Sequence, residues 1–154
     1  MIARRRRPRP GAREDILKPF NVLVVDDERD FLDPIVERLE LRKLSAHGVD
    51  NGADALTYLD QHPVDVVVLD VKMPGMDGLQ VLKRIKTRHP LVEVILLTGH
   101  ASVESGMEGL ELGAFDYLIK PVKLDDLLER LLEAYDRRQV MAEMAQGAHG
   151  PQGD

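Results

Sequence analysis

The 154-residue sequence contains no cysteine, which excludes disulfide bonds, thiolate catalysis and metal sites built on cysteine. It also lacks any apolar run near the roughly 18 residues that a membrane-spanning helix needs. The arginine-rich start could imitate the charged region of an export signal, but no apolar stretch follows it. We therefore expect a cytoplasmic protein that neither is exported nor enters a membrane.

Hydrophobic residues make up 44% and charged residues 31% of the chain, which is typical of a soluble globular protein. The length is sufficient for one domain with a substantial core and two tails. The net charge of -6 is unevenly distributed, because residues 1–13 contain no acid and six of the 21 basic residues. The remaining 15 basic and 27 acidic residues give the rest of the chain a net charge of -12.

The first 17 residues are rich in arginine, proline and glycine, a composition that cannot bury a core, so we expect a disordered arm. A solvated tail, or a start codon assigned too far upstream, is the favoured interpretation. Nonspecific binding of nucleic acid through phosphate contacts is the alternative. We expect the globular domain at residues 18–138, and a helical extension followed by a disordered tail at 139–154. The arginines of the arm are Arg4, Arg5, Arg6, Arg7, Arg9 and Arg13.

Strand-like and helical patterns alternate between the tails. Apolar runs of strand length occupy 22–25, 64–69, 92–97 and 115–119, with a weaker one near 44–49. Strands without a polar face, such as "VEVILLT", are typical of a parallel sheet that is covered on both sides. Five strand–helix repeats in about 120 residues predict a doubly wound α/β domain, in which right-handed crossovers bring all strand carboxyl ends to one edge.

Helical spacing of apolar residues predicts helices around 32–39, 53–59, 79–85, 102–112 and from 124 onward. Because proline is tolerated in the first turn of a helix, we expect Pro34 to lie in the first turn of the first helix. Asp77 is positioned to cap the third helix. Gly106 and Gly109 each cost the fourth helix roughly 1 kcal/mol against alanine, so we expect this helix to be the least stable.

Polar residues follow four of the apolar strands. Asp26 and Asp27 follow the first strand, and Asp70, Thr98 and Lys120 end the third, fourth and fifth. Carboxylates held together at one edge repel one another and raise each other's pKa unless a cation lies among them. Oxygen ligands favour a hard cation such as Mg²⁺, and a lysine and a hydroxyl can bind phosphoryl oxygens. The pattern predicts transfer of a phosphoryl group to a carboxylate, with Asp70 as the candidate acceptor.

The segments "VLVVDDE", "VVVLDVKMPGMDG", "VILLTGH" and "FDYLIKPV", in this order over residues 20–138, resemble the receiver domain of two-component response regulators. The resemblance implies a flavodoxin-like fold with strand order 2-1-3-4-5. It also implies that a histidine kinase or phosphotransfer protein donates a phosphoryl group to Asp70 in the presence of Mg²⁺, with Mn²⁺ as a substitute. On this basis the protein is a phosphoacceptor that catalyses its own phosphotransfer and dephosphorylation, and is not otherwise an enzyme.

The resemblance also assigns roles to individual residues. Asp26, Asp27 and Asp70 match the family's metal ligands, together with the backbone carbonyl of Lys72. Thr98 matches the switch hydroxyl and Lys120 the lysine that contacts the phosphoryl group, and the bond from Lys120 to Pro121 matches one that is cis in the family. Tyr117 matches the aromatic switch position, although a plain core aromatic fits the sequence equally well. His100, two residues after Thr98, and Lys72 match positions that tune dephosphorylation.

Two other classes fit less well. A phosphatase of the haloacid dehalogenase type has an Asp-x-Asp pattern after its first strand, whereas "VVDDERD" has adjacent acids and would leave Asp70 without a role. A receiver-like scaffold usually lacks one of the acids, the threonine or the lysine, and all are present here.

Beyond residue 138 too little sequence remains for a helix-turn-helix output domain, so we expect a single-domain regulator that acts by binding partners or passing phosphate on. The expected switch surface comprises the helix at 102–112, the strand at 115–119 and the helix from 124, and could support a homodimer. Apolar residues beyond the usual domain end would extend it, namely Val140, Met141 and Met144.

Overall fold

The computed structural model describes residues 19–99 and 103–149. Its centre is a parallel five-stranded sheet of order β2-β1-β3-β4-β5, which confirms the predicted fold and strand order. The strands are β1 (Asn21–Val25), β2 (Ser45–Val49), β3 (Val66–Asp70), β4 (Glu93–Thr98) and β5 (Asp116–Ile119).

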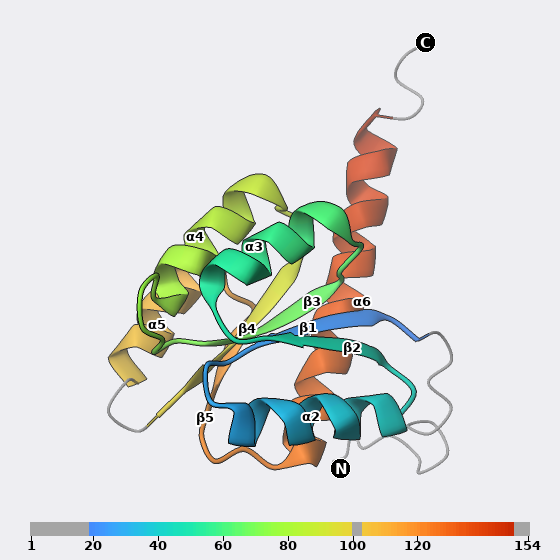
Figure 1. The fold of residues 1–154 in the computed structure, drawn as a ribbon. Helices are drawn as coiled ribbons and strands as arrows, with labels where there is room; N and C mark the ends of the chain where they lie inside the picture. Colours follow the sequence, from blue (N-terminus) through green and yellow to red (C-terminus); the bar gives the residue numbers. More distant parts are fainter. Residues whose placement is uncertain (1–18, 100–102, 150–154) are drawn as a thin grey trace, which may run out of the picture.

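Helices cover both faces of the sheet (Figure 1). On one face lie α3 (Gly52–Gln61), α4 (Gly78–Arg88) and α5 (Val103–Glu111), and on the other lie α2 (Arg29–Leu41) and α6 (Leu124–His149). Because β3 and β4 contact both helical layers, every residue of these two strands is buried. This explains why their sequences are almost continuously apolar.

Local sequence signals define several helix ends, and one of them is the predicted cap at Asp77. The side chain of Asp77 accepts a hydrogen bond of 3.0 Å from the backbone N–H of Gln80 and caps α4. Asn51 caps α3 in the same way through the N–H of Asp54, at 2.8 Å. Helix α5 is followed by Gly113, whose φ of +108° is a conformation that favours glycine.

The expected position of Pro34 is wrong. Helix α2 begins at Arg29, so Pro34 lies in its second turn instead of its first. There it removes the backbone N–H that would donate to the carbonyl of Asp30. Asp30 is exposed, so water can satisfy that carbonyl, and the helix continues through the proline. The first turn begins earlier because Glu28, directly after the acidic pair, takes the N-cap position.

The glycines of α5 allow this helix to lie close to the sheet. A Cβ atom on Gly106 would come within 2.8 Å of the Tyr117 ring, and one on Gly109 within 2.1 Å of the Leu96 side chain. Their low helix propensity is therefore accompanied by a steric requirement that the sequence pattern did not reveal.

The amino-terminal edge of the sheet is tied to α6. Phe20 and Tyr135 stack with their ring centroids 4.2 Å apart. Arg137 Nε lies 3.3 Å from a carboxylate oxygen of Glu93, and Arg138 Nε lies 3.1 Å from one of Asp65, as an ion pair without hydrogen-bond geometry.

Beyond these contacts α6 extends past the body of the domain to His149 (Figure 1). Val140, Met141 and Met144 on this extension are exposed. No helix within the described ranges combines the length and apolar character needed to cross a bilayer. The arginine arm lies outside the described residues.

Candidate functional site

The structure brings the three predicted carboxylates together. One carboxylate oxygen from each of Asp26, Asp27 and Asp70 lies within 4.8 Å of the others. The cause is strand register, because Val25 at the end of β1 pairs with Leu69 near the end of β3. The residues that follow each of these positions therefore meet at the carboxyl-terminal edge of the sheet.

Asp26 is fully buried, and its hydrogen bonds connect it to several elements around the site. Its backbone N–H donates to the carbonyl of Val49 at 3.1 Å. Its Oδ1 accepts a 2.9 Å hydrogen bond from the backbone N–H of Glu28, and its Oδ2 accepts one of 2.8 Å from Lys120 Nζ. Asp26 thereby joins β1, β2, the start of α2 and the end of β5.

Asp70 is buried at the end of β3, and its Oδ1 accepts a 3.3 Å hydrogen bond from the backbone N–H of Lys72. Burial raises the pKa of Asp70 to about 6, and the negative charge of Asp26 adds to this. Lys120 and the Lys72 N–H act in the opposite direction on this pKa, and Asp27 raises it further. A neighbouring cation would therefore be strongly favoured here.

Lys120 lies beside the carboxylates, but its nearest partner is Asp26. Its Nζ is 2.8 Å from Asp26 Oδ2 and 3.9 Å from Asp70 Oδ2, too far for a hydrogen bond. Partial burial opposes the charged form, yet the hydrogen bond with Asp26 and the nearby negative charges raise the pKa of Lys120. Its peptide bond with Pro121 is cis, as the resemblance implied.

Thr98 ends β4 next to β3 and is completely buried. Its hydroxyl oxygen has no hydrogen-bond partner in the described part of the chain. Buried polar atoms without partners are uncommon and costly, so this hydroxyl is a candidate ligand-binding group.

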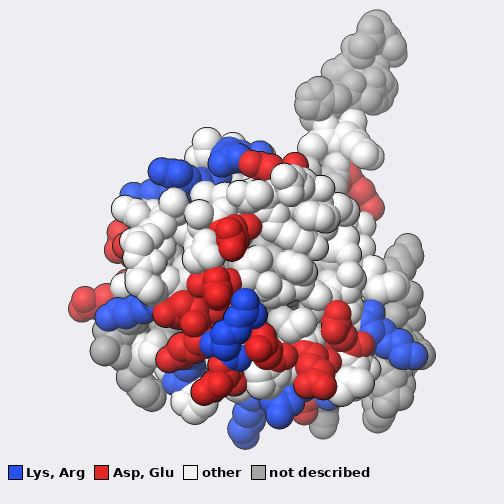
Figure 2. Space-filling model, viewed as in Figure 1, with Lys and Arg blue, Asp and Glu red and all other residues white. Residues whose placement is uncertain are grey.

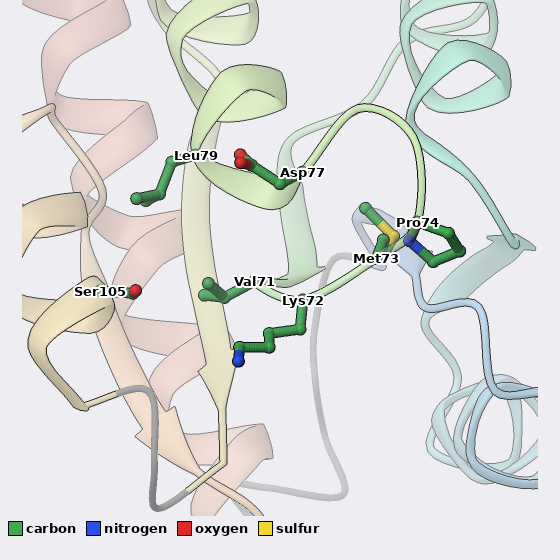
Figure 3. Close-up of a pocket in the computed structure, with 7 residues that line it drawn as sticks. All are labelled: Val71, Lys72, Met73, Pro74, Asp77, Leu79 and Ser105. Carbon is green, nitrogen blue, oxygen red and sulfur yellow. The ribbon is translucent and has the colours of Figure 1, made fainter.

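The loop after β3 bends sharply back across the site. Gly75 has a φ of +80°, and a Cβ atom on Gly78 would lie 2.4 Å from the carbonyl oxygen of Asp70. The backbone at Gly75 therefore favours glycine, and the close approach at Gly78 leaves no room for a side chain. Between this loop and α5 lies a pocket of about 410 Å³, whose lining residues come from the loop, the start of α4 and α5 (Figure 3). They are Val71, Lys72, Met73, Pro74, Asp77, Leu79 and Ser105.

Tyr117 on β5 is half-buried and packs against the core between the sheet and α3, α4 and α5. Its ring faces Gly106 of α5. The structure therefore places the predicted switch aromatic at the contact between β5 and the glycine-containing helix. His100 lies outside the described residues.

Two residues near the site were missed by the sequence reasoning. Glu28 Oε1 lies 3.6 Å from Lys120 Nζ, and the same nitrogen lies 4.5 Å from the centroid of the Phe31 ring. Their spacing of three residues at the start of a helix was the available signal, because it places them on one helical face. Figure 2 shows acidic side chains gathered where β1 leads into α2, with a basic side chain among them.

Comparisons with known proteins agree with this geometry. The family model described as the response regulator receiver domain matches residues 22–132. The DNA-binding transcriptional regulator NtrC of Escherichia coli K12 is 39% identical over 121 residues, which are 77% of this chain and 26% of NtrC. The positive alginate biosynthesis regulatory protein of Pseudomonas aeruginosa is 38% identical over 140 residues, which are 86% of this chain and 56% of that protein. The chain thus spans about a quarter to a half of these relatives.

Solved structures show the same fold. The receiver domain of the Francisella response regulator 1452 superimposes with a TM-score of 0.71 at 33% identity, covering 77% of this chain and 98% of that one. NtrX from Brucella abortus, in complex with ADP, gives a TM-score of 0.80 at 28% identity and covers 84% of this chain and 30% of that one. Sequence, fold and site geometry agree: the chain belongs to the response regulator receiver domain family, the phosphoacceptor module of two-component signalling.

Proposed function

We propose that Asp70 is the residue that accepts the phosphoryl group, and that a phosphohistidine on a histidine kinase or phosphotransfer protein donates it. The observation that carries this proposal is the setting of Asp70: a buried strand-end carboxylate beside two further carboxylates, a lysine and an unpartnered hydroxyl. Such a set serves no evident structural purpose, because the three like charges repel one another.

In the proposed step an ionised oxygen of Asp70 attacks phosphorus. The bond between phosphorus and the imidazole nitrogen of the donor breaks, and its electron pair returns to the imidazole. The chain carries out this step once on itself, and hydrolysis of the acyl phosphate returns it to the starting state. Lys120 and Thr98 lie near Asp70, and we expect both to bind the phosphoryl oxygens, Lys120 after its ammonium shifts from Asp26 toward Asp70.

The donor set at the site fits a hard divalent cation. Asp26, Asp27, Asp70 and the backbone carbonyl of Lys72 would hold Mg²⁺, or Mn²⁺ in its place. When bound, the cation would neutralise the carboxylates and the charge on the transferring phosphoryl group. The raised pKa of Asp70 supports this assignment, because burial and then the charge of Asp26 disfavour the ionised carboxylate, and a cation would offset both effects.

Phosphorylation would then act on the contact between β5 and α5. Drawing the Thr98 hydroxyl toward a phosphoryl oxygen would free space beside the end of β4, into which the Tyr117 ring could turn. Because Gly106 lies directly against this ring, α5 is the element that would shift. The responding surface of α5, β5 and α6 exposes Met107, Leu110 and Ile119, which suits a protein partner or a second copy of the chain.

The proposal for Asp70 is tested by intact-mass measurement after incubation with acetyl phosphate and Mg²⁺. The wild-type protein should gain one phosphoryl group and Asp70→Asn should gain none. Asp65→Asn, a carboxylate at the opposite edge of the sheet, is the matched control and should label normally. Equal labelling of wild type and Asp70→Asn would remove Asp70 from this role, and no labelling of any variant would favour a scaffold.

The switch is tested separately with beryllofluoride, which mimics the phosphoryl group, by amide NMR. Residues from about 98 to 120 should shift far more than those of α3. Shifts around Ala53 to Leu59 with none near Tyr117 would contradict the mechanism.

We further propose that the protein works in the cytoplasm, where such donors are found.

A further inference from the structure

We propose that Glu28 and Phe31 are positioning residues that hold Lys120 away from Asp70 before phosphorylation and thereby slow phosphoryl acceptance. The inference rests on the proposed role of Asp70 and adds a restraint to it. It concerns two side chains at the start of α2. Both contact Lys120, and neither has a described contact with the carboxylate of Asp70.

The ammonium group of Lys120 is surrounded unevenly. Asp26 and Glu28 contribute carboxylate oxygens at 2.8 and 3.6 Å, whereas the nearest oxygen of Asp70 is 3.9 Å away. A lysine that binds a phosphoryl oxygen on Asp70 must therefore move away from its present partners. Each interaction on the α2 side favours the resting position, and so opposes that movement.

Glu28 is well suited to this restraint. It is the N-cap residue of α2, but its side chain makes no capping hydrogen bond. Among the described residues, Lys120 lies within ion-pair distance of the Glu28 carboxylate. The neighbouring Arg29 pairs instead with Asp33 and Asp50. The Glu28 side chain is 68% exposed, so its attraction to Lys120 is modest and sensitive to salt.

Phe31 provides a second, uncharged contact with the same group. Its ring packs against the core beneath α2, and its centroid lies 4.5 Å from Lys120 Nζ. A cation held over an aromatic face at this distance is attracted by the ring quadrupole. A pocket of about 630 Å³ lined by Glu28, Phe31, Arg38 and Lys120 among others adjoins this contact, so the Glu28 side chain has room to turn away when Lys120 moves.

The test is the rate at which full-length protein is labelled by acetyl phosphate in the presence of Mg²⁺, measured as a function of donor concentration. Glu28→Gln should raise the maximal rate about two- to five-fold, the range expected for loss of one exposed ion pair. Asp30→Asn is the matched control, because it removes the same charge from the same turn, and Asp30 is not among the described carboxylates within ion-pair distance of Lys120. It should leave the maximal rate unchanged and alter only the donor concentration at half-maximal rate.

Two further measurements separate restraint from general charge effects. At roughly 0.5 M salt the ratio of the maximal labelling rates of Glu28→Gln and wild type should fall toward one, because salt screens an exposed ion pair. Phe31→Leu keeps an apolar side chain at this position and should raise the maximal rate in the same direction at both salt concentrations. Equal maximal rates for wild type, Glu28→Gln and Phe31→Leu would overturn the inference while leaving Asp70 as acceptor. Absence of labelling in the wild type would instead overturn the proposed function.

Discussion

At the amino-terminal edge of the sheet two carboxylates each have an arginine beside them, whereas at the carboxyl-terminal edge three carboxylates cluster and Lys120 lies within ion-pair distance of two of them. Glu93 and Asp65 lie next to Arg137 and Arg138 of α6, and Asp65 also accepts a 2.9 Å hydrogen bond from the backbone of Asn21. Asp26, Asp27 and Asp70 instead lie within 4.8 Å of one another.

The comparison separates stability from function within one sheet. The paired edge anchors α6, and removing a partner there should weaken the fold. The crowded edge contains repulsion, a carboxyl group of raised pKa and a buried hydroxyl without a described partner, all of which cost stability. Unfavourable features of this kind persist in proteins where a ligand or a reaction relieves them. The following predictions test whether the two edges really differ in this way.

The largest difference should appear in metal binding. Asp27→Ala should weaken Mg²⁺ binding by about tenfold or more, because it removes a charged oxygen ligand. Glu93→Gln, which removes one carboxylate from the paired edge, should leave the affinity unchanged. Isothermal titration calorimetry at constant ionic strength measures both. An unchanged affinity in Asp27→Ala would argue against this residue as a ligand.

Neutralising one carboxylate at each edge should change stability in opposite directions. With divalent cations chelated at pH 7.5, Asp70→Asn should increase the free energy of unfolding by roughly 2 kcal/mol, because a buried and repelled charge is removed. Glu93→Gln should decrease it by roughly 1 kcal/mol, because Arg137 loses its partner. Urea denaturation provides the values. Two changes of the same sign would break the comparison.

The stabilisation by Asp70→Asn should depend on pH. The folded-state pKa of Asp70 is raised from 3.8 to about 6, so the cost of its ionisation is fully present above pH 6. That cost falls as the folded state is protonated below pH 6, and it vanishes once the unfolded state is protonated too, below its pKa of 3.8. The difference in unfolding free energy between Asp70→Asn and wild type should therefore shrink between pH 6 and 4. A constant difference over this range would mean that the Asp70 pKa is not raised.

The smallest effect is expected for the arginine arm. If residues 1–17 form a solvated tail, their deletion should change neither the melting temperature nor the labelling rate measurably. Both edges of the sheet should then behave as in the full chain. Duplex DNA provides the counter-test, since salt-sensitive binding by the full chain that is lost on deletion would favour the nucleic-acid alternative.

Much of the fold was predictable because its signals are local. Apolar runs indicated all five strands within about two residues, and Asp77 marked the start of α4 as expected. Pro34 was misplaced because proline spacing alone does not reveal that α2 starts directly after the acidic pair. The glycines of α5 were interpreted through helix propensity, although their closest neighbours are Tyr117 and Leu96 on two different strands.

The sequence by itself determined which residues end the strands, and therefore which carboxylates, hydroxyl and lysine could meet at one edge, because a parallel sheet brings such positions together. Only the tertiary structure decided how they meet. Lys120 lies against Asp26, Glu28 and Phe31 instead of Asp70, and the Thr98 hydroxyl is left without a partner. The physical reason is that differences of a few tenths of an ångström between atoms of separate elements decide which side chains form hydrogen bonds. The positions of the strands along the sequence do not specify such distances.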